Sequence, residues 1–365
     1  MLNSLGLNKA PKDTKVAIAM SGGVDSSAVA YMLKEEGYDV FGITMSLLPS
    51  KEKQNNQNIS ENIKDAAVVA KQLGIEHHNL DFTKEFREAI IEYFAKTYFS
   101  GKTPSPCILC NRDVKFGIMA KKAVELGADL IVTGHYANME IEGDNIKLYR
   151  GEDVRRDQSY FLFSANKKYL KLARFPLAGY TKDQTRAVAT KAGLDVATKS
   201  DSQDICFVPD GKYAEIIQDV MPEKQVVPGD IVHVDGEVLG KHKGLIYYTI
   251  GQRRGLGIGG REVLYVIKLD AKTNQVIVGS QEDLKQRKVL INQINWLGDG
   301  DTPPKELYCE VKLRSRQAPV KAKVEFGDDD TAEVTILEEF YGVAPGQGCC
   351  FYLENRVLGG GFIVE

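Results

Sequence analysis

The chain has 365 residues, a length that allows two or three domains. Its 47 Lys and Arg residues against 50 Asp and Glu residues give a net charge of −3, so any nucleic-acid partner must be held by local basic patches. No apolar run reaches the about 18 residues of a membrane span, and the first residues lack the charged and apolar regions of a signal peptide, so we expect a soluble, cytoplasmic protein that contacts no membrane.

The first two hundred residues alternate strand-like and helix-like segments. Residues 15–20 form a short apolar run of strand length, and a helical pattern follows that ends at Gly37. Further strands are expected over 38–45 and 128–133, with a helix over 60–73. This βαβ order predicts an α/β fold, an open parallel sheet with helices on both faces.

The rhythm changes near Gly211, where short strands broken by Gly, Pro and Asp begin and helices nearly vanish. One or two small β domains, of barrel type, are therefore expected to follow the α/β domain. In this region Gly255, Gly257 and Gly260 satisfy the dinucleotide-binding string G-x-G-x-x-G. A strand-like segment follows them, so no helix N-terminus is available for a pyrophosphate, and the string predicts a loop.

The stretch S-G-G-V-D-S-S over residues 21–27 joins the first strand to the first helix. Its glycines let a ligand approach the backbone, its hydroxyl and carboxylate groups supply oxygens, and free N–H groups of the first helical turn point at the same place. The Walker pattern with its lysine does not occur. A serine-capped helix is the structural alternative, but the strand-loop-helix context favours a phosphate site.

Six cysteines, two of them adjacent, do not fit a disulfide framework and indicate reduced thiols with individual roles. Cys107 and Cys110 stand before an expected helix, and a thiol near a helix N-terminus is expected to have a lowered pKa. A zinc site would need a second ligand pair, which is absent, and a thioredoxin-like pair would need a different context. Cys206, taken alone, is typical of a small buried hydrophobe.

The loop at 21–27 resembles the S-G-G-x-D-S loop of the PP-loop ATP pyrophosphatases, which cleave ATP between its α- and β-phosphates. Eight strings together resemble the tRNA-specific 2-thiouridylases in order and spacing: MSGGVDSS, TPSPCILCN, VTGHYA, RRDQSYFL, SDSQDICF, TIGQRRGLGIGG, RSRQAP and PGQGCCFY. The resemblance covers essentially the whole chain. It implies a PP-loop ATP-binding domain over 1–211, a small, mostly β central domain over 212–280 and a C-terminal β-barrel over 281–365.

The resemblance also implies roles for single residues. Cys110 corresponds to the catalytic nucleophile and Cys206 to the cysteine that carries a persulfide. ATP, with Mg²⁺ placed by the loop aspartate, would be bound by Ala19, Met20, Ser21, Gly22, Gly23, Val24, Asp25, Ser26, Met45 and Gly134. The tRNA would be contacted by Ser105, Pro106, Cys107, His135, Arg156, Asp157, Gln158, Arg314, Ser315 and Gln347. Taken alone, His135 could equally be a packed core histidine.

These roles imply ATP-dependent 2-thiolation of the wobble uridine in tRNA anticodons. The base would be adenylated with release of pyrophosphate, and sulfur from the Cys206 persulfide, released by Cys110, would then expel AMP and leave a Cys110–Cys206 disulfide. The partners would be tRNA and a persulfide donor or sulfur-carrier protein.

Two questions stay open at the level of sequence. Many family members have Asp where this chain has Cys107, and in members with C-x-x-C the thiols of Cys107, Cys110 and Cys206 could hold an iron–sulfur cluster. We favour persulfide chemistry because it requires no cofactor beyond ATP and Mg²⁺. The other functions to consider are a different PP-loop enzyme, such as another tRNA thiolase or an amidating enzyme, and an RNA-binding protein that keeps nucleotide as a structural switch.

Overall fold

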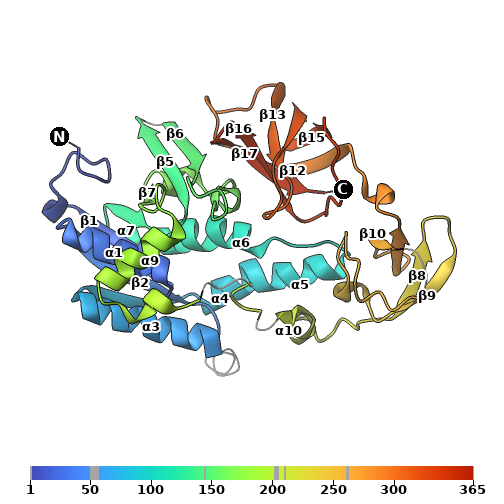
Figure 1. Cartoon of the computed structure of the whole chain (residues 1–365), viewed down its shortest axis with the longest axis horizontal. Helices are drawn as coiled ribbons and strands as arrows, with labels where there is room; N and C mark the ends of the chain where they lie inside the picture. Colours follow the sequence, from blue (N-terminus) through green and yellow to red (C-terminus); the bar gives the residue numbers. More distant parts are fainter. Residues whose placement is uncertain are drawn as a thin grey trace. The chain divides into compact units, whose positions relative to one another are not determined.

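A computed structural model describes residues 2–49, 57–143, 145–200, 205–208, 211–259 and 263–364, with backbone alone for 57–60. The chain divides into two compact units (Figure 1). Unit 1 comprises Met1–Ala89, Cys107–Gly211 and Asn355–Val357. Unit 2 comprises Ile90–Pro106, Lys212–Glu354 and Leu358–Glu365.

Unit 1 is built on an open parallel sheet, as predicted; it has five strands in the order β3-β2-β1-β4-β7. The strands are β1 (Lys15–Ala19), β2 (Asp39–Ser46), β3 (Glu76–Asp81), β4 (Leu130–Val132) and β7 (Ala173–Arg174). Val16 of β1 pairs with Val40 on one side and with Leu130 on the other. The strand order therefore reverses beside β1, the position at which open α/β sheets bind ligands at their carboxyl edge.

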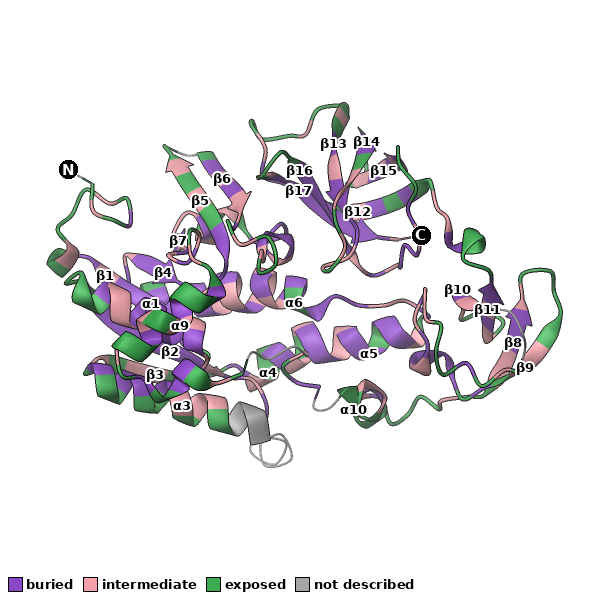
Figure 2. Cartoon of the chain, viewed as in Figure 1, coloured by how far each residue is buried: buried purple, intermediate pink, exposed green. Residues whose placement is uncertain are grey.

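Helices cover both faces of this sheet. Successive side chains of β1 point to opposite faces and pack against different helices. Val16 and Ile18 are buried in a cluster with residues of the helices α1 (Val24–Glu35), α3 (Gln57–Leu73) and α9 (Lys182–Lys191). Ala17 lies in a second cluster with Met119 and the residues of α7 (Ala120–Glu125). Figure 2 shows β1, β2 and β4 as largely buried. Helix α3 begins three residues before the predicted position, at Gln57.

The segment that carries Cys107 and Cys110 is helical, rather than a loop before a helix. Helix α6 (Pro106–Leu109) runs directly into the π-helical segment η3 (Cys110–Met119) and then into α7. Inside η3, Phe116 has non-helical dihedral angles, φ −95° and ψ 26°. π-Helical turns are rare and occur frequently at functional sites. The backbone conformation of this stretch therefore makes it a candidate functional site.

Unit 2 contains two β structures. The central one is a four-stranded sheet in the order β10-β11-β8-β9, with β8 (Gly229–His233), β9 (Val238–His242), β10 (Tyr265–Asp270) and β11 (Gln275–Gly279). Helix α10 (Tyr213–Val220) precedes it, and Tyr213 stacks on Tyr98 of α5 (Glu92–Phe99) with ring centroids 5.2 Å apart.

The C-terminal structure is a closed β-barrel, as predicted. Its strands follow the order β12-β15-β14-β13-β16-β17, and β12 also pairs with β17. They are β12 (Lys288–Trp296), β13 (Glu306–Lys312), β14 (Val320–Phe326), β15 (Thr331–Ile336), β16 (Gly348–Leu353) and β17 (Arg356–Ile363). Gly359 has φ +125°, and a Cβ there would lie 2.1 Å from the Asn295 carbonyl oxygen, so only glycine closes the barrel at this point.

Strand β17 takes part in both units. Its first residues, Arg356 and Val357, pair with Tyr149 and Leu148 of β6 (Asn145–Arg150), which pairs in turn with β5 (Ala137–Glu142). The remaining described elements are short: η1 (Pro11–Asp13), α4 (Thr83–Phe86), η2 (Arg87–Ile91), η4 (Ser159–Phe161), α8 (Lys167–Leu170), η5 (Asp195–Thr198), η7 (Leu245–Tyr247) and η8 (Glu282–Leu284).

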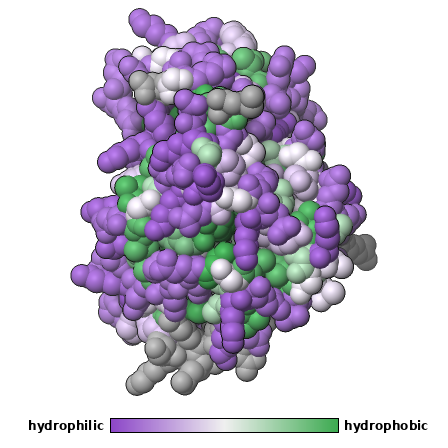
Figure 3. All heavy atoms as spheres, turned by 90° about the vertical axis from the view of Figure 1, so that its left-hand side faces the viewer, coloured by the Kyte–Doolittle hydropathy of each residue, from purple (hydrophilic) through white to green (hydrophobic). Residues whose placement is uncertain are grey.

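The glycine-rich string in the central domain is a loop that precedes a strand, as predicted. Gly255 and Gly257 have positive φ values of +77° and +70°, and β10 follows; Gly260 lies outside the described residues. On the face drawn in Figure 3, hydrophilic side chains predominate, with hydrophobic ones between them. None of the helices in the described part of the chain combines the length and apolar character needed to cross a membrane.

Candidate active site

The loop after β1 lies at the carboxyl edge of the sheet and leads into α1. The Met20 amide donates to the Ile43 carbonyl oxygen at 2.8 Å, which anchors the start of the loop on β2. Gly23 is the N-cap of α1, and in the described chain no side chain caps this helix end. The Ser26 hydroxyl instead accepts from the Ser21 amide at 3.2 Å. The alternative of a serine-capped helix is therefore wrong, and the first-turn amides remain available.

Gly22 holds this loop against α3. Its φ is +71°, and a Cβ on it would lie 2.0 Å from the Asn62 carbonyl oxygen. Lys199 reinforces the contact, because its ammonium donates to the Gly22 carbonyl at 3.2 Å and to the Asn62 side chain at 2.7 Å, and pairs with Asp65. Lys199 thus ties the loop to the neighbouring helix.

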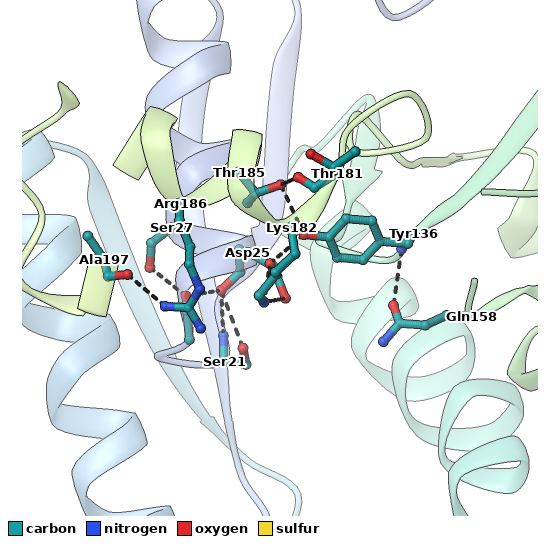
Figure 4. Close-up of polar contacts among 12 residues, drawn as sticks. Ser21, Asp25, Ser27, Tyr136, Gln158, Thr181, Lys182, Thr185, Arg186 and Ala197 are labelled. Atoms are coloured by element: carbon teal, nitrogen blue, oxygen red, sulfur yellow. Dashed lines mark hydrogen bonds and ion pairs between the residues drawn. The ribbon is translucent and has the colours of Figure 1, made fainter. Parts of the chain in front are cut away.

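Asp25 of the loop is paired with a lysine of α9. The Lys182 ammonium lies 2.8 and 2.9 Å from the two carboxylate oxygens of Asp25 (Figure 4). The Tyr136 hydroxyl donates to the same carboxylate at 2.9 Å and lies 2.9 Å from the Thr185 hydroxyl. The Asp25 carboxylate, which is predicted to place Mg²⁺, therefore accepts hydrogen bonds from Lys182 and Tyr136 in this structure.

Gly134 and His135, just after β4, connect this loop to the helix of the cysteines. A Cβ on Gly134 would lie 2.9 Å from both Asp25 Cβ and the Ser26 amide nitrogen, so the backbone touches α1. The His135 ring packs against Phe116 of η3 with centroids 6.1 Å apart. Gly134 thus contacts the loop after β1, and His135 contacts the π-helical segment η3. These two contacts connect the predicted phosphate site with the segment that carries Cys110, within unit 1.

His135 itself is a packed histidine. It is 8% exposed, hydrogen-bonded through Nδ1 to the Thr133 hydroxyl at 2.6 Å, and lies edge-on to Phe175. Burial, with a smaller effect of the Lys115 charge, holds the pKa of His135 well below its usual value, so the ring is neutral near pH 7. Contact of His135 with tRNA stays a prediction.

The three cysteines of interest lie near one another in unit 1. All are free thiols; Cys107 and Cys206 are exposed and Cys110 is half-buried. Cys206 lies in the short described segment 205–208. The next residue, Phe207, is buried and its ring meets that of Phe86 edge-on, with centroids 5.6 Å apart. Cys107 and Cys110 both act electrostatically on the Cys206 thiol. A Cys110–Cys206 disulfide is not present and stays a prediction for one step of a reaction.

The expected lowering of the thiol pKa values is wrong. Burial raises the pKa of Cys110 to about 11 and raises the pKa values of Cys107 and Cys206 as well. The ammonium of Lys115, half-buried in η3, acts in the opposite direction on all three. Cys107 and Cys206 expose part of their surface to solvent, and the protein around the rest of each side chain raises its pKa more than the Lys115 charge lowers it.

The metal predictions differ in how well they fit these residues. In the described part of the chain, no three His, Cys, Asp or Glu side chains are arranged to hold a metal ion. The three thiols are therefore neighbours without the geometry of an iron–sulfur ligand set. Mg²⁺ fits better, since it is commonly bound by one or two carboxylates together with substrate phosphates, and Asp25 supplies a carboxylate.

The remaining ATP-site residues lie on the same sheet edge. Ala19 ends β1, Met45 lies in β2 beside Leu80 of β3, and Val24 begins α1. Together with the loop glycines and serines they surround the carboxyl ends of the central strands. Their contacts with ATP stay a prediction.

Two of the predicted RNA-contacting residues in unit 1 accept hydrogen bonds from backbone amides of the protein itself. Asp157 accepts hydrogen bonds from the amides of Gly151 and Ser159, and the Gln158 side chain accepts from the Tyr136 amide at 3.0 Å. Arg156, by contrast, is exposed. Contact of Arg156, Asp157 and Gln158 with tRNA stays a prediction.

The predicted residues in unit 2 are also engaged within that unit. Gln347 donates to the carbonyl oxygens of Thr103 and Pro104 at 3.0 Å each, just before buried Ser105 and Pro106. Arg314 is half-buried and donates to the Ile250 carbonyl at 2.9 Å, next to half-buried Ser315. Contact of these residues with RNA stays a prediction.

Sequence reasoning missed four residues of the site: Lys115, Tyr136, Lys182 and Lys199. Lys182 is 157 positions from Asp25 and Lys199 is 177 from Gly22, so no local pattern connects them. One signal was available, because the string T-K-D-Q over 181–184 forms a capping box and marks Lys182 as the first residue of a helix.

Comparisons with known proteins cover the whole chain. The family described as "tRNA methyl transferase HUP domain" matches residues 14–210, "tRNA methyl transferase PRC-barrel domain" matches 214–280, and "Aminomethyltransferase beta-barrel domain" matches 286–363. A solved 4-thiouridine synthetase–RNA complex with bound ATP shares 19% identity and a TM-score of 0.37 over 57% of this chain and 51% of that chain, a likeness that decides nothing further.

Curated relatives are much closer. The "tRNA-specific 2-thiouridylase MnmA" of Rhodospirillum centenum is 47% identical over 375 residues, covering 100% of this chain and 95% of that protein. The protein of the same name from Brucella ovis is 47% identical over 372 residues, covering 99% of this chain and 93% of that protein. By this identity over its full length, the chain belongs to the tRNA-specific 2-thiouridylase family.

Proposed function

We propose that this chain is an ATP-dependent tRNA sulfurtransferase that converts the wobble uridine of anticodons to 2-thiouridine. Membership of the 2-thiouridylase family supports sulfur transfer to a tRNA uridine. The observation that carries the proposal is the contact of Gly134 with the loop after β1 and of His135 with η3. It joins an anion site suited to a nucleotide with a group of three thiols in one unit.

The first step activates the base. The C2 carbonyl oxygen of uracil attacks the α-phosphorus of ATP, which forms an O-adenylated base and releases pyrophosphate. The first-turn amides of α1 bind the departing phosphates, because their N–H groups and the positive end of the helix dipole favour anions. Mg²⁺, when bound, would be held by Asp25 with phosphate oxygens and would neutralise part of their charge.

The second step transfers sulfur. Cys206 accepts a sulfur atom from an external persulfide donor, and its terminal sulfur attacks C2 of the adenylated base and expels AMP. The Cys110 thiolate then attacks the Cys206 sulfur, which releases 2-thiouridine and forms a Cys110–Cys206 disulfide; an external thiol reduces it. Burial opposes ionisation of Cys110, and the charge of Lys115 favours it.

The test uses the whole chain with Mg²⁺, ATP, an unmodified tRNA transcript and a persulfide donor. We expect pyrophosphate release and a nucleoside with the mass of uridine in which sulfur replaces one oxygen. Cys110→Ser and Cys206→Ser should each abolish thiolation and keep tRNA-dependent pyrophosphate release, since adenylation needs neither sulfur. A methylated nucleoside, ATP-dependent amidation, or RNA binding without pyrophosphate release would contradict the proposal and favour a methyltransferase, another PP-loop enzyme or a binding protein.

A further inference from the structure

The ion pair between Lys182 and Asp25 lies where the nucleotide's phosphates are expected. The Lys182 side chain is only 11% exposed and that of Asp25 is 29% exposed. Asp25 belongs to the first turn of α1, where the helix dipole already favours a carboxylate. Burying this pair costs desolvation that the attraction between its two charges only roughly offsets.

The backbone at Lys182 is fixed while its ammonium can move. Thr181 caps α9 and Gln184 completes the capping box, so the first turn of this helix is well defined. Thr185, one turn on, is tied to Tyr136. Figure 4 shows Lys182 reaching from α9 toward Asp25 beside the Tyr136 ring. A lysine has a flexible four-carbon stem, so its charge can shift by a few ångström without any change in the helix.

We propose that Lys182 is a phosphate-binding residue that Asp25 holds in the nucleotide-free protein and that passes to the pyrophosphate portion of ATP when Mg²⁺ binds the Asp25 carboxylate. The exchange leaves every charge paired: the carboxylate moves from an ammonium to a metal ion, and the ammonium moves from a carboxylate to a phosphate. Release of Mg²⁺ and pyrophosphate restores the Lys182–Asp25 pair. This inference rests on the proposed function, since it assigns a residue to its first step.

The direct test measures binding without turnover. Titration calorimetry with Mg²⁺ and pyrophosphate should give an affinity for Lys182→Met about tenfold or more below that of the unchanged chain, because a charge-assisted contact is lost. AMP, which lacks the departing phosphates, should bind equally to both. Lys182→Arg should recover part of the affinity. Lys191→Met is the matched control, since Lys191 is an exposed lysine at the other end of α9.

A reciprocal test separates partner exchange from a structural ion pair. Without Mg²⁺, Asp25→Asn should bind pyrophosphate more tightly than the unchanged chain, because Lys182 no longer has to leave a carboxylate. Without nucleotide, Lys182→Gln should bind Mn²⁺ more tightly, measured by electron paramagnetic resonance, because the carboxylate is released. Lys182→Gln also removes the charge while keeping a polar group, so it serves if Lys182→Met does not fold.

Unchanged pyrophosphate affinity in folded Lys182→Met or Lys182→Gln, with only the melting temperature reduced, would overturn the proposal and make the pair structural. That outcome differs from failure of the proposed function. If the unchanged chain neither binds ATP nor releases pyrophosphate with tRNA, the function itself is wrong. If it does both and the Lys182 variants bind Mg²⁺ and pyrophosphate normally, only the role of Lys182 is wrong.

Discussion

The reactivity of Cys110 depends on two opposing effects on its pKa. Burial raises the pKa to about 11, and Lys115 lowers it. Lys115 follows Cys110 by five positions in a π-helical segment, whose i→i+5 hydrogen bonds return the chain to nearly the same side. The unusual helix thus brings a cation to the thiols, and the thiolate fraction of Cys110 depends on it.

Replacing Lys115 by Met should make Cys110 less reactive. Loss of the ammonium raises the pKa of this thiol further, so alkylation by iodoacetamide should slow by roughly several-fold between about pH 7 and pH 10. Peptide mass spectrometry of each cysteine over time measures the rate. Lys122→Met is the control, because Lys122 pairs with Glu125 on the exposed side of α7. Equal rates for both variants would show that Lys115 does not act on Cys110.

A second substitution distinguishes persulfide from cluster chemistry. Cys107→Asp should keep thiolation activity, because the thiols lack the arrangement of a metal site among the described residues. Iron and sulfide are assayed after anaerobic purification, together with thiolation. If the unchanged chain retains iron and the variant loses both iron and activity, Cys107 is a cluster ligand and the persulfide mechanism is wrong.

Elements were easier to predict from the sequence than the contacts between them. The strand, loop and helix around Asp25 follow from local patterns, because apolar spacing and small residues act over a few positions. The cysteine group was expected only through the resemblance, and the raised thiol pKa values were not expected, because burial depends on packing partners far away in the chain. Lys182 and Lys199 were missed for the same reason: a lysine has no local signature of its tertiary partner.

The contact between the loop and α3 predicts a large loss of stability at Gly22 and a small change at the adjacent Gly23. Gly22→Ala should lower the free energy of unfolding by about 2 kcal/mol or more, since it combines a positive φ with a Cβ collision against Asn62. Gly23→Ala should change it by less than about 1 kcal/mol, because Gly23 has φ −100° and its nearest neighbour would lie 3.5 Å away. Denaturant titration measures both. Similar losses would mean that the loop does not depend on this contact.

On the scale of the whole molecule, RNA affinity must come from local charges, since the net charge is −3. Arg156→Ala should reduce the slope of log affinity against log salt by about one unit, as expected for one lost phosphate contact. Arg314→Ala should mainly lower the melting temperature, because it removes the hydrogen bond to Ile250. Filter binding of tRNA over a salt series measures the slopes. A larger slope change for Arg314→Ala than for Arg156→Ala would reverse this assignment.

Strand β17 affects the order in which the protein can fold during translation. Its first residues pair with β6 and its later residues close the barrel against β12. A ribosome makes β6 well before β17, so one edge of β6 stays unpaired until β17 has been made. Exposed strand edges promote association between chains. In a nascent chain the free edge of β6 is therefore open to association with other chains for as long as β17 remains in the ribosomal tunnel.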